Sequence, residues 1–396
     1  MTDLLYQLSS PQDIYGYYTV GDLKTYSKLE AIEAETRTGH SVHWHFNDET
    51  FASYDWSIEP RESLNELYRQ RAQQIRDDYD YIVLNYSSGS DSDNILTTFL
   101  NNNIKLDEIL SMTNYDGIHS KETQHNKEIY HCVPERVQAA QTIQPHIKHR
   151  MMDTVQPTVD YFTETGIGVD YGYLSNGYLG PNQIAKIRAR NKVPEWVKMR
   201  DAGKRVAFVW GSDKPFVRGI NGKYYFFFRD MFGNTVTADQ QINYQEGFVD
   251  ELFYWHPKSA KMLIKQGHVV KNYLKSATTT TPYVEEISAK VMLENISNCV
   301  INAIGDKFYR INFDGVRAII YPNWRDNHLT FKNIPTFISL RDEWIFNMPD
   351  DYFVKRILVN TYNGVWNNLP DKWKNDRKNQ IKGIKHCNSQ PYYLGE

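Results

Sequence analysis

A short apolar run at residues 81–86 most constrains the fold of this 396-residue chain. The run reads Tyr-Ile-Val-Leu-Asn-Tyr, a composition typical of a strand that is buried on both faces of a parallel sheet. Before it, apolar side chains recur at helical spacing through residues 61–78. After it, the polar residues 87–92 lead directly into a second helical pattern at 94–101. Helix, buried strand, polar loop and helix in this order predict an α/β fold.

The same alternation continues along the next hundred residues. We expect strands at residues 108–113, 146–152 and 205–210, and helices at 121–142, 183–190 and 196–201. Strands that alternate with helices imply right-handed crossovers, and therefore a Rossmann-like parallel sheet. Asn221-Gly222 follows the last of these strands and separates two strand-forming runs, so we expect a β-hairpin at the edge of the α/β domain.

We expect three units along the chain. Residues 1–60 form a small α+β segment, in which 41–46 and 50–56 pair as a hairpin. Residues 61–245 form the α/β domain. Residues 246–396 form a mostly helical region that determines the substrate, with helices at 259–276, 284–304 and 351–360.

Composition excludes several classes of protein. Lys and Arg (45) nearly balance Asp and Glu (48), for a net charge of −3, so extended binding to nucleic acid is not expected. No stretch approaches the roughly 20 apolar residues that span a bilayer, and the first residues lack the pattern of a signal peptide. The three cysteines lie far apart, which is typical of a reducing compartment. These features favour a soluble cytoplasmic protein without a membrane partner.

The polar loop at 87–92 carries the clearest chemical signal. It lies where the carboxyl end of a buried strand meets the start of a helix, and such a place binds phosphate groups through unpaired N–H groups. Its sequence is Ser87-Ser88-Gly89-Ser90-Asp91-Ser92. The small residues let the backbone approach a ligand, and the serine hydroxyls can donate to phosphate oxygens. Asp91 repels an anion, so we expect it to act through Mg²⁺.

This loop resembles the PP-loop of the N-type ATP pyrophosphatases, whose pattern is Ser-Gly-Gly-x-Asp-Ser. Ser87, Gly89, Asp91 and Ser92 match the pattern, whereas Ser88 replaces its first glycine. The preceding helix and strand are similar to the start of the synthetase domain of asparagine synthetases. The resemblance implies an adenine nucleotide alpha hydrolase-like fold, ATP and Mg²⁺ as cofactors, and a loop that binds the ATP phosphates through residues 87–92.

A second segment lies after the expected strand at 205–210. Gly211-Ser212-Asp213-Lys214 resembles the Gly-x-Gly-x-Asp-Glu stretch of asparagine synthetases, with Asp213 at the acidic position and Lys214 in place of glutamate. The resemblance implies nucleotide contacts from Gly211 and Ser212, and magnesium binding by Asp213 together with Asp91. Lys214 would neutralise charge on the oxygen that leaves with pyrophosphate.

Three further residues complete the expected site. Tyr86, Met112 and Thr113 lie at predicted strand ends, where the adenine is expected. Asp91, Asp213 and Lys214 are the expected catalytic residues.

The resemblance implies an enzyme that cleaves ATP to AMP and pyrophosphate and so activates a carboxylate or carbonyl oxygen of a small molecule. An amine or ammonia then displaces AMP. Thr2 follows Met1, so no N-terminal cysteine is available to hydrolyse glutamine, and residues 1–60 are too few for a glutaminase. Two alternatives remain open: a PP-loop enzyme that modifies a nucleobase or nucleoside, for which the 14% aromatic residues offer stacking surfaces, and a catalytically silent nucleotide-binding module.

Overall fold

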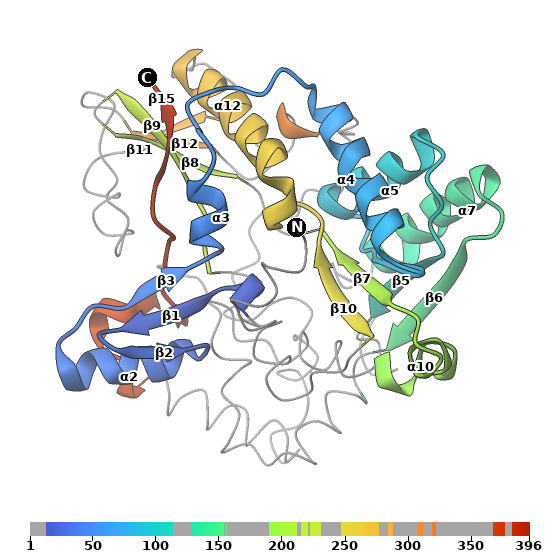
Figure 1. Ribbon diagram of the computed structural model, residues 1–396, viewed down its shortest axis with the longest axis horizontal. Coiled ribbons are helices and arrows are strands. Elements are labelled where there is room, and N and C mark those ends of the chain that lie inside the picture. Colours follow the sequence, from blue (N-terminus) through green and yellow to red (C-terminus); the bar gives the residue numbers. More distant parts are fainter. Residues whose placement is uncertain are drawn as a thin grey trace.

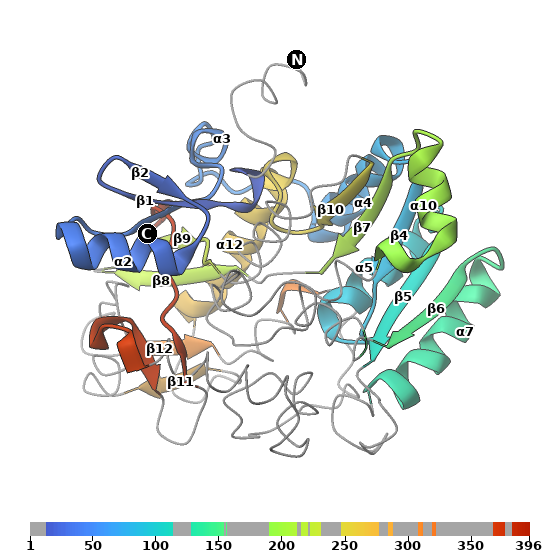
Figure 2. The same cartoon turned by 90° about the horizontal axis from the view of Figure 1, so that it is seen from below.

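A five-stranded sheet, all of whose strands are parallel, forms the centre of one lobe of the computed structural model (Figure 2). The strand order is β10-β7-β4-β5-β6, so the strand expected at 81–86 lies in the middle, as its apolar sequence predicts. This sheet confirms the α/β class and is compatible with a Rossmann-like fold. The structure describes residues 13–113, 128–153, 156, 190–211, 215–220, 222–230, 247–276, 284–287, 308–311, 319–321, 367–376 and 382–396.

The strands of the sheet follow the apolar runs of the sequence. Their bounds are β4 (Tyr81–Asn85), β5 (Glu108–Thr113), β6 (Lys148–Asp153), β7 (Val206–Trp210) and β10 (Phe248–Leu252). Every residue of β5 and of β7 is buried. The one carboxylate within these two strands, Glu108, accepts hydrogen bonds from Tyr81 and Trp196 and pairs with Arg150, which offsets the cost of burying its charge.

Helices cover both faces of this sheet. α4 (Leu64–Asp78) and α5 (Ser90–Asn101) pack together on one face, and α10 (Pro194–Asp201) lies on the other (Figure 2). α4 begins at a capping box in which Ser63 and Glu66 satisfy each other's backbone N–H groups. A π-helical turn (Glu128–Cys132) leads into α7 (Val133–Ile143), so the described part of the helix expected at 121–142 is helical.

The region after residue 245 differs from the expectation of a mostly helical segment. α12 (Ala260–Ser276) is a long helix, as expected, but β10 adds a fifth strand to the main sheet beyond the expected end of the α/β domain. Two acidic residues, Asp250 and Glu251, interrupt the apolar pattern of β10, so the sequence does not predict this strand. They face opposite sides of the sheet, where Asp250 pairs with Arg190 and Glu251 with Arg71.

Other described residues of this region are also extended. β11 (Val284–Ile287) pairs with β12 (Phe308–Ile311), so the start of the helix expected at 284–304 is a strand instead. The rest of that segment, residues 183–189 of the helix expected at 183–190, and the helix expected at 351–360 lie outside the described residues. The remaining short elements are η1 (Asp13–Tyr15), η4 (Arg190–Lys192), η5 (Pro257–Ser259), η7 (Asp371–Trp373), β13 (Lys374–Asp376) and β14 (Lys382–Ile384).

The N-terminal segment is α+β, but its expected hairpin is wrong. β1 (Tyr17–Val20) pairs with β2 (Leu23–Thr25) on one side and with β3 (His43–His45) on the other, and α2 (Lys28–Thr38) connects the last two. The second hairpin strand, expected at 50–56, does not form: residues 50–52 belong to the short helix α3 (Asp48–Ala52). Asp48 turns the chain after β3 because its carboxylate accepts the Phe46 N–H, 3.2 Å away.

The hairpin expected around Asn221-Gly222 forms, but it belongs to a smaller, separate sheet. β8 (Phe216–Ile220) and β9 (Lys223–Phe227) are antiparallel, and Gly222 has the positive φ that such a turn requires. The hairpin does not extend the main sheet as expected; β9 pairs instead with β15 (Tyr392–Gly395) at the end of the chain. Helix α12 contacts this smaller sheet and α4, and lies between the two lobes (Figures 1 and 2). Within the described ranges, no helix has the length and apolar character that crossing a bilayer demands.

Candidate functional site

The polar loop lies at the carboxyl end of the central strand, where the sequence places it. β4 ends at Asn85, and α5 begins at Ser90, four residues earlier than expected. Gly89 occupies the N-cap position and no side chain caps the helix, whereas Ser27 and Ser63 cap α2 and α4. The start of α5 thus has no capping side chain at its N-cap, and a helix N-terminus is suited to an anion.

Ser88 has a left-handed backbone, with φ at +64°. The other described residues with positive φ are glycines and two asparagines. For a serine, this left-handed conformation costs about 1–2 kcal/mol. Ser88 replaces the first glycine of the PP-loop pattern, so the chain here has the conformation that glycine adopts without strain. Backbone strain of this kind gathers at functional sites.

Two serine hydroxyls of the loop, those of Ser92 and Ser90, differ in whether they have hydrogen-bond partners among the described residues. Ser92 ties the loop to the helix, because its hydroxyl donates to the Gly89 carbonyl at 3.1 Å and accepts the Ser87 N–H at 3.4 Å. Ser90 is buried, and its hydroxyl has no hydrogen-bond partner in the part of the chain that the structure describes. A buried polar group without a partner is uncommon in proteins and points to a bound ligand or water.

Asp91 is held by two tyrosines that come from distant parts of the chain. The Tyr321 hydroxyl donates to its carboxylate oxygen Oδ1, and the Tyr254 hydroxyl donates to its backbone carbonyl at 2.9 Å. The amide of Asn94 donates to the Tyr254 hydroxyl at 3.0 Å. Burial raises the pKa of both tyrosines well above the usual range, with the charge of Asp91 adding to the effect, so both hydroxyls stay protonated at neutral pH.

The residues expected near the adenine lie at the same edge of the sheet and are all buried. Tyr86 donates to the carboxylate of Asp93 at 2.9 Å, and the guanidinium of Arg136 binds the same oxygen at 2.7 Å. Met112 and Thr113 end β5, and the Thr113 hydroxyl donates to Tyr130 at 3.4 Å. The structure thus brings all three to the carboxyl ends of neighbouring strands.

Gly211 links the second predicted segment to the loop. It follows β7, the strand beside β4, and a β-carbon on it would lie 3.1 Å from the carbonyl carbon of Asp91. The two segments singled out in the sequence therefore converge at this point. Ser212, Asp213 and Lys214 lie outside the described residues, and among the described ones no three His, Cys, Asp or Glu residues cluster in a way that could hold a metal ion.

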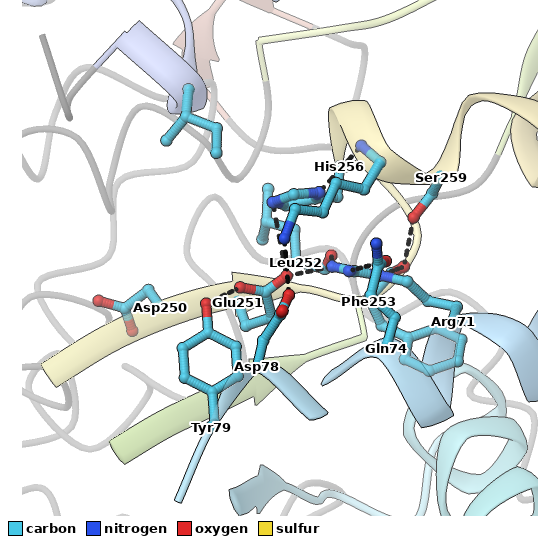
Figure 3. A network of polar contacts seen from close by, with 12 residues as sticks. Arg71, Gln74, Asp78, Tyr79, Asp250, Glu251, Leu252, Phe253, His256 and Ser259 are labelled. Atoms are coloured by element: carbon cyan, nitrogen blue, oxygen red, sulfur yellow. Dashed lines mark hydrogen bonds and ion pairs between the residues drawn. The ribbon is translucent and has the colours of Figure 1, made fainter. Parts of the chain in front are cut away.

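A buried ionic network next to the site was missed by sequence reasoning. Figure 3 shows Arg71 of α4 and Tyr79 converging on Glu251 of β10. Arg71 also donates to the carbonyls of Leu252 and Phe253, at 2.8 and 3.1 Å, and so fixes the chain where it leaves the sheet. Residues 251–257, Glu-Leu-Phe-Tyr-Trp-His-Pro, are an unusual run in which a glutamate precedes three consecutive aromatic residues. Nothing in the sequence, however, links this run to α4.

His256 lies against the same carboxylate and is uncharged at neutral pH. Burial lowers the pKa of His256 to about 3, although Glu251 opposes the effect. Burial raises the pKa of Glu251, but His256, Arg71 and the Tyr79 hydroxyl outweigh it and bring that pKa down to about 2. Because His256 is neutral at pH 7, Arg71 provides the positive charge that balances Glu251 under those conditions.

The fold and the loop define an α/β protein whose polar, strained loop follows the central strand of a parallel sheet. No protein-family model matches the sequence, and no curated protein is detectably similar to it. The function must therefore be argued from the site.

Proposed function

We propose that residues 87–92 bind the phosphates of ATP with Mg²⁺, and that the protein is an AMP-forming adenylating enzyme of the PP-loop type. The observation that carries the proposal is the left-handed backbone of Ser88, at the position where the PP-loop pattern has glycine. A loop shaped around phosphate groups would account for the cost of that conformation.

The surroundings of the loop favour a polyphosphate. Helix α5 points its N-terminus, with a partial positive charge and no capping side chain, toward the loop. The buried Ser90 hydroxyl supplies an additional donor. Gly211 lets the backbone at the end of β7 approach the start of α5 closely.

Mg²⁺ fits this donor set because it prefers carboxylate oxygens together with phosphate oxygens. Asp91 would hold the ion, with Asp213 as the second ligand. The ion would supply charge neutralisation for the leaving pyrophosphate. Lys214 would stabilise the same negative charge, and the N–H groups at the start of α5 would orient the triphosphate.

In the proposed reaction, a carboxylate or carbonyl oxygen of a small molecule attacks the α-phosphorus of ATP. The bond to the bridging oxygen breaks and pyrophosphate leaves. An amine or ammonia then attacks the activated carbon and releases AMP, which forms a C–N bond. The same chemistry on a carbonyl of a nucleobase is the second candidate within the class.

The products of ATP distinguish the candidates. Purified protein is incubated with Mg²⁺ and α-labelled ATP, alone and with pools of amino acids, amines and nucleosides. The proposal predicts AMP rather than ADP, formed only with one pool, which identifies the acceptor class. Nucleotide binding without AMP from any pool supports the silent binding module, and ADP as the product contradicts α–β cleavage.

A further inference from the structure

The two tyrosines on Asp91 fix different parts of the same residue. Tyr321 engages the carboxylate and Tyr254 engages the backbone carbonyl, so the side chain and the first turn of α5 are both restrained. The rings are tilted against each other with centroids 5.7 Å apart. A carboxylate has about four acceptor sites on two oxygens, so a hydrogen bond from a tyrosine and a bound cation are compatible on one carboxylate.

Tyr68 anchors the segment that carries Tyr321. Its hydroxyl donates to the carbonyl of Ile320 at 2.7 Å and accepts from the side-chain amide of Gln266 at 2.9 Å. Its ring lies edge-on to Tyr254, with centroids 5.9 Å apart. Residues of α4 and α12 thereby set the position of a tyrosine that is 230 residues from Asp91 in the sequence.

The ionic network of Figure 3 anchors Tyr254. Arg71 holds the two carbonyls that precede this residue, and its ion pair with Glu251 fixes the end of β10. The hydroxyl of Tyr254 reaches Asp91 from this rigid base. A buried tyrosine requires a polar partner, and the hydroxyls of Tyr254 and Tyr321 both donate to Asp91, the one acidic residue of the loop.

We propose that Tyr321 and Tyr254 are positioning residues, which orient Asp91 and the start of α5 for the metal-bound phosphates. This inference rests on the proposed function. Hydrogen bonds to a ligating carboxylate set its orientation and raise metal affinity by roughly 10–100-fold. Phenylalanine fills the space of a tyrosine ring, so packing alone does not account for the hydroxyls at these two positions.

The test compares Tyr321→Phe with Tyr81→Phe, which removes a hydroxyl from another buried carboxylate, Glu108. Calorimetry measures binding of α,β-methylene-ATP across a range of Mg²⁺ concentrations. Tyr321→Phe should raise the Mg²⁺ concentration needed for half-maximal binding by about 10–100-fold and leave metal-free binding unchanged. Tyr81→Phe should alter neither.

A second readout needs no nucleotide. Hydrogen exchange of the amides at 90–92 should be faster in Tyr321→Phe than in the wild type, and unchanged in Tyr81→Phe. Wild-type Mg²⁺ dependence and wild-type exchange in Tyr321→Phe would overturn the positioning role. A wild-type protein that binds no nucleotide would instead overturn the proposed function, and the role in metal binding with it.

Discussion

Gly211 and Ser92 approach so closely that a β-carbon on the glycine would lie 3.1 Å from the serine's backbone nitrogen. This contact joins the carboxyl end of β7 to the first turn of α5. Neither partner is a flexible side chain, so an added methyl group must displace the backbone of the loop.

Gly211→Ala should therefore weaken nucleotide binding through the shape of the loop. Overpacking of this kind costs about 1–3 kcal/mol of unfolding free energy. The control is Gly203→Ala, at a position with positive φ and open space around it, at the opposite end of the sheet. Urea denaturation and titration with α,β-methylene-ATP should show lost stability in both variants but lost binding in Gly211→Ala alone. Equal binding in the two would contradict the role of this contact.

Ser88→Gly should preserve the loop and increase stability. Glycine adopts positive φ without the cost of about 1–2 kcal/mol, although its freedom in the unfolded chain cancels part of the gain. Ser88→Val should be destabilising, because a β-branched residue is a true outlier at this φ. Thermal unfolding and nucleotide titration check both variants. Loss of binding in a stable Ser88→Gly variant would assign the function to the hydroxyl instead of the backbone.

Arg71→Met should be strongly destabilising because it leaves Glu251 charged and buried. Removal of one partner of a buried ion pair costs about 3–5 kcal/mol. The control is Lys258→Met, which removes a half-exposed partner of Asp78 nearby and should cost at most about 1 kcal/mol. Chemical denaturation measures both losses. A loss in Arg71→Met no larger than in the control would show that the network does not stabilise the fold.

The stability of the protein should fall with pH below about 6.5, the ordinary pKa of histidine. The pKa of His256 is lowered to about 3 in the folded protein, so between these values the unfolded chain binds a proton that the folded chain does not. The contribution of His256 is complete above pH 6.5 and is lost as the pH falls toward 3. Glu251, with its pKa lowered to about 2, adds a further loss only below about pH 4.3.

His256→Gln isolates this contribution. His149, His268 and His386 have pKa values that burial also lowers, so they give the wild type and the variant a common background. The unfolding free energy of the variant should depend less steeply on pH between 6.5 and 4.5. Parallel curves for the two proteins would contradict a neutral, buried His256.

The parts of the fold that sequence predicted are those fixed by local composition. The buried runs at 81–86, 108–113 and 205–210 became adjacent strands because apolar residues on both faces fit only the centre of a sheet. β10 was missed because the partners of its acidic residues, Arg71 and Arg190, lie far away in the sequence. A local pattern cannot reveal a charge pair of that kind.

The candidate site, too, has a part that local sequence predicts and a part that depends on residues far apart in the chain. The loop was visible as a short motif after a strand, although α5 begins at Ser90, four residues before the expected start of the helix. The contacts of Tyr254 and Tyr321 with Asp91 join residues 163 and 230 positions apart, and no periodicity encodes them. The hairpin at Asn221-Gly222 shows the same limit, since its turn was predicted but its partner β15 was not.

The most direct test of the account is the binding of α,β-methylene-ATP with Mg²⁺ to the wild type and to Asp91→Asn, measured by calorimetry on folded proteins. Asparagine keeps the size of the side chain and an oxygen that can accept from Tyr321, but removes the charge. The account predicts Mg²⁺-dependent binding by the wild type and loss of the Mg²⁺ dependence in Asp91→Asn. No binding by the wild type, or the same Mg²⁺ dependence in both proteins, would contradict it.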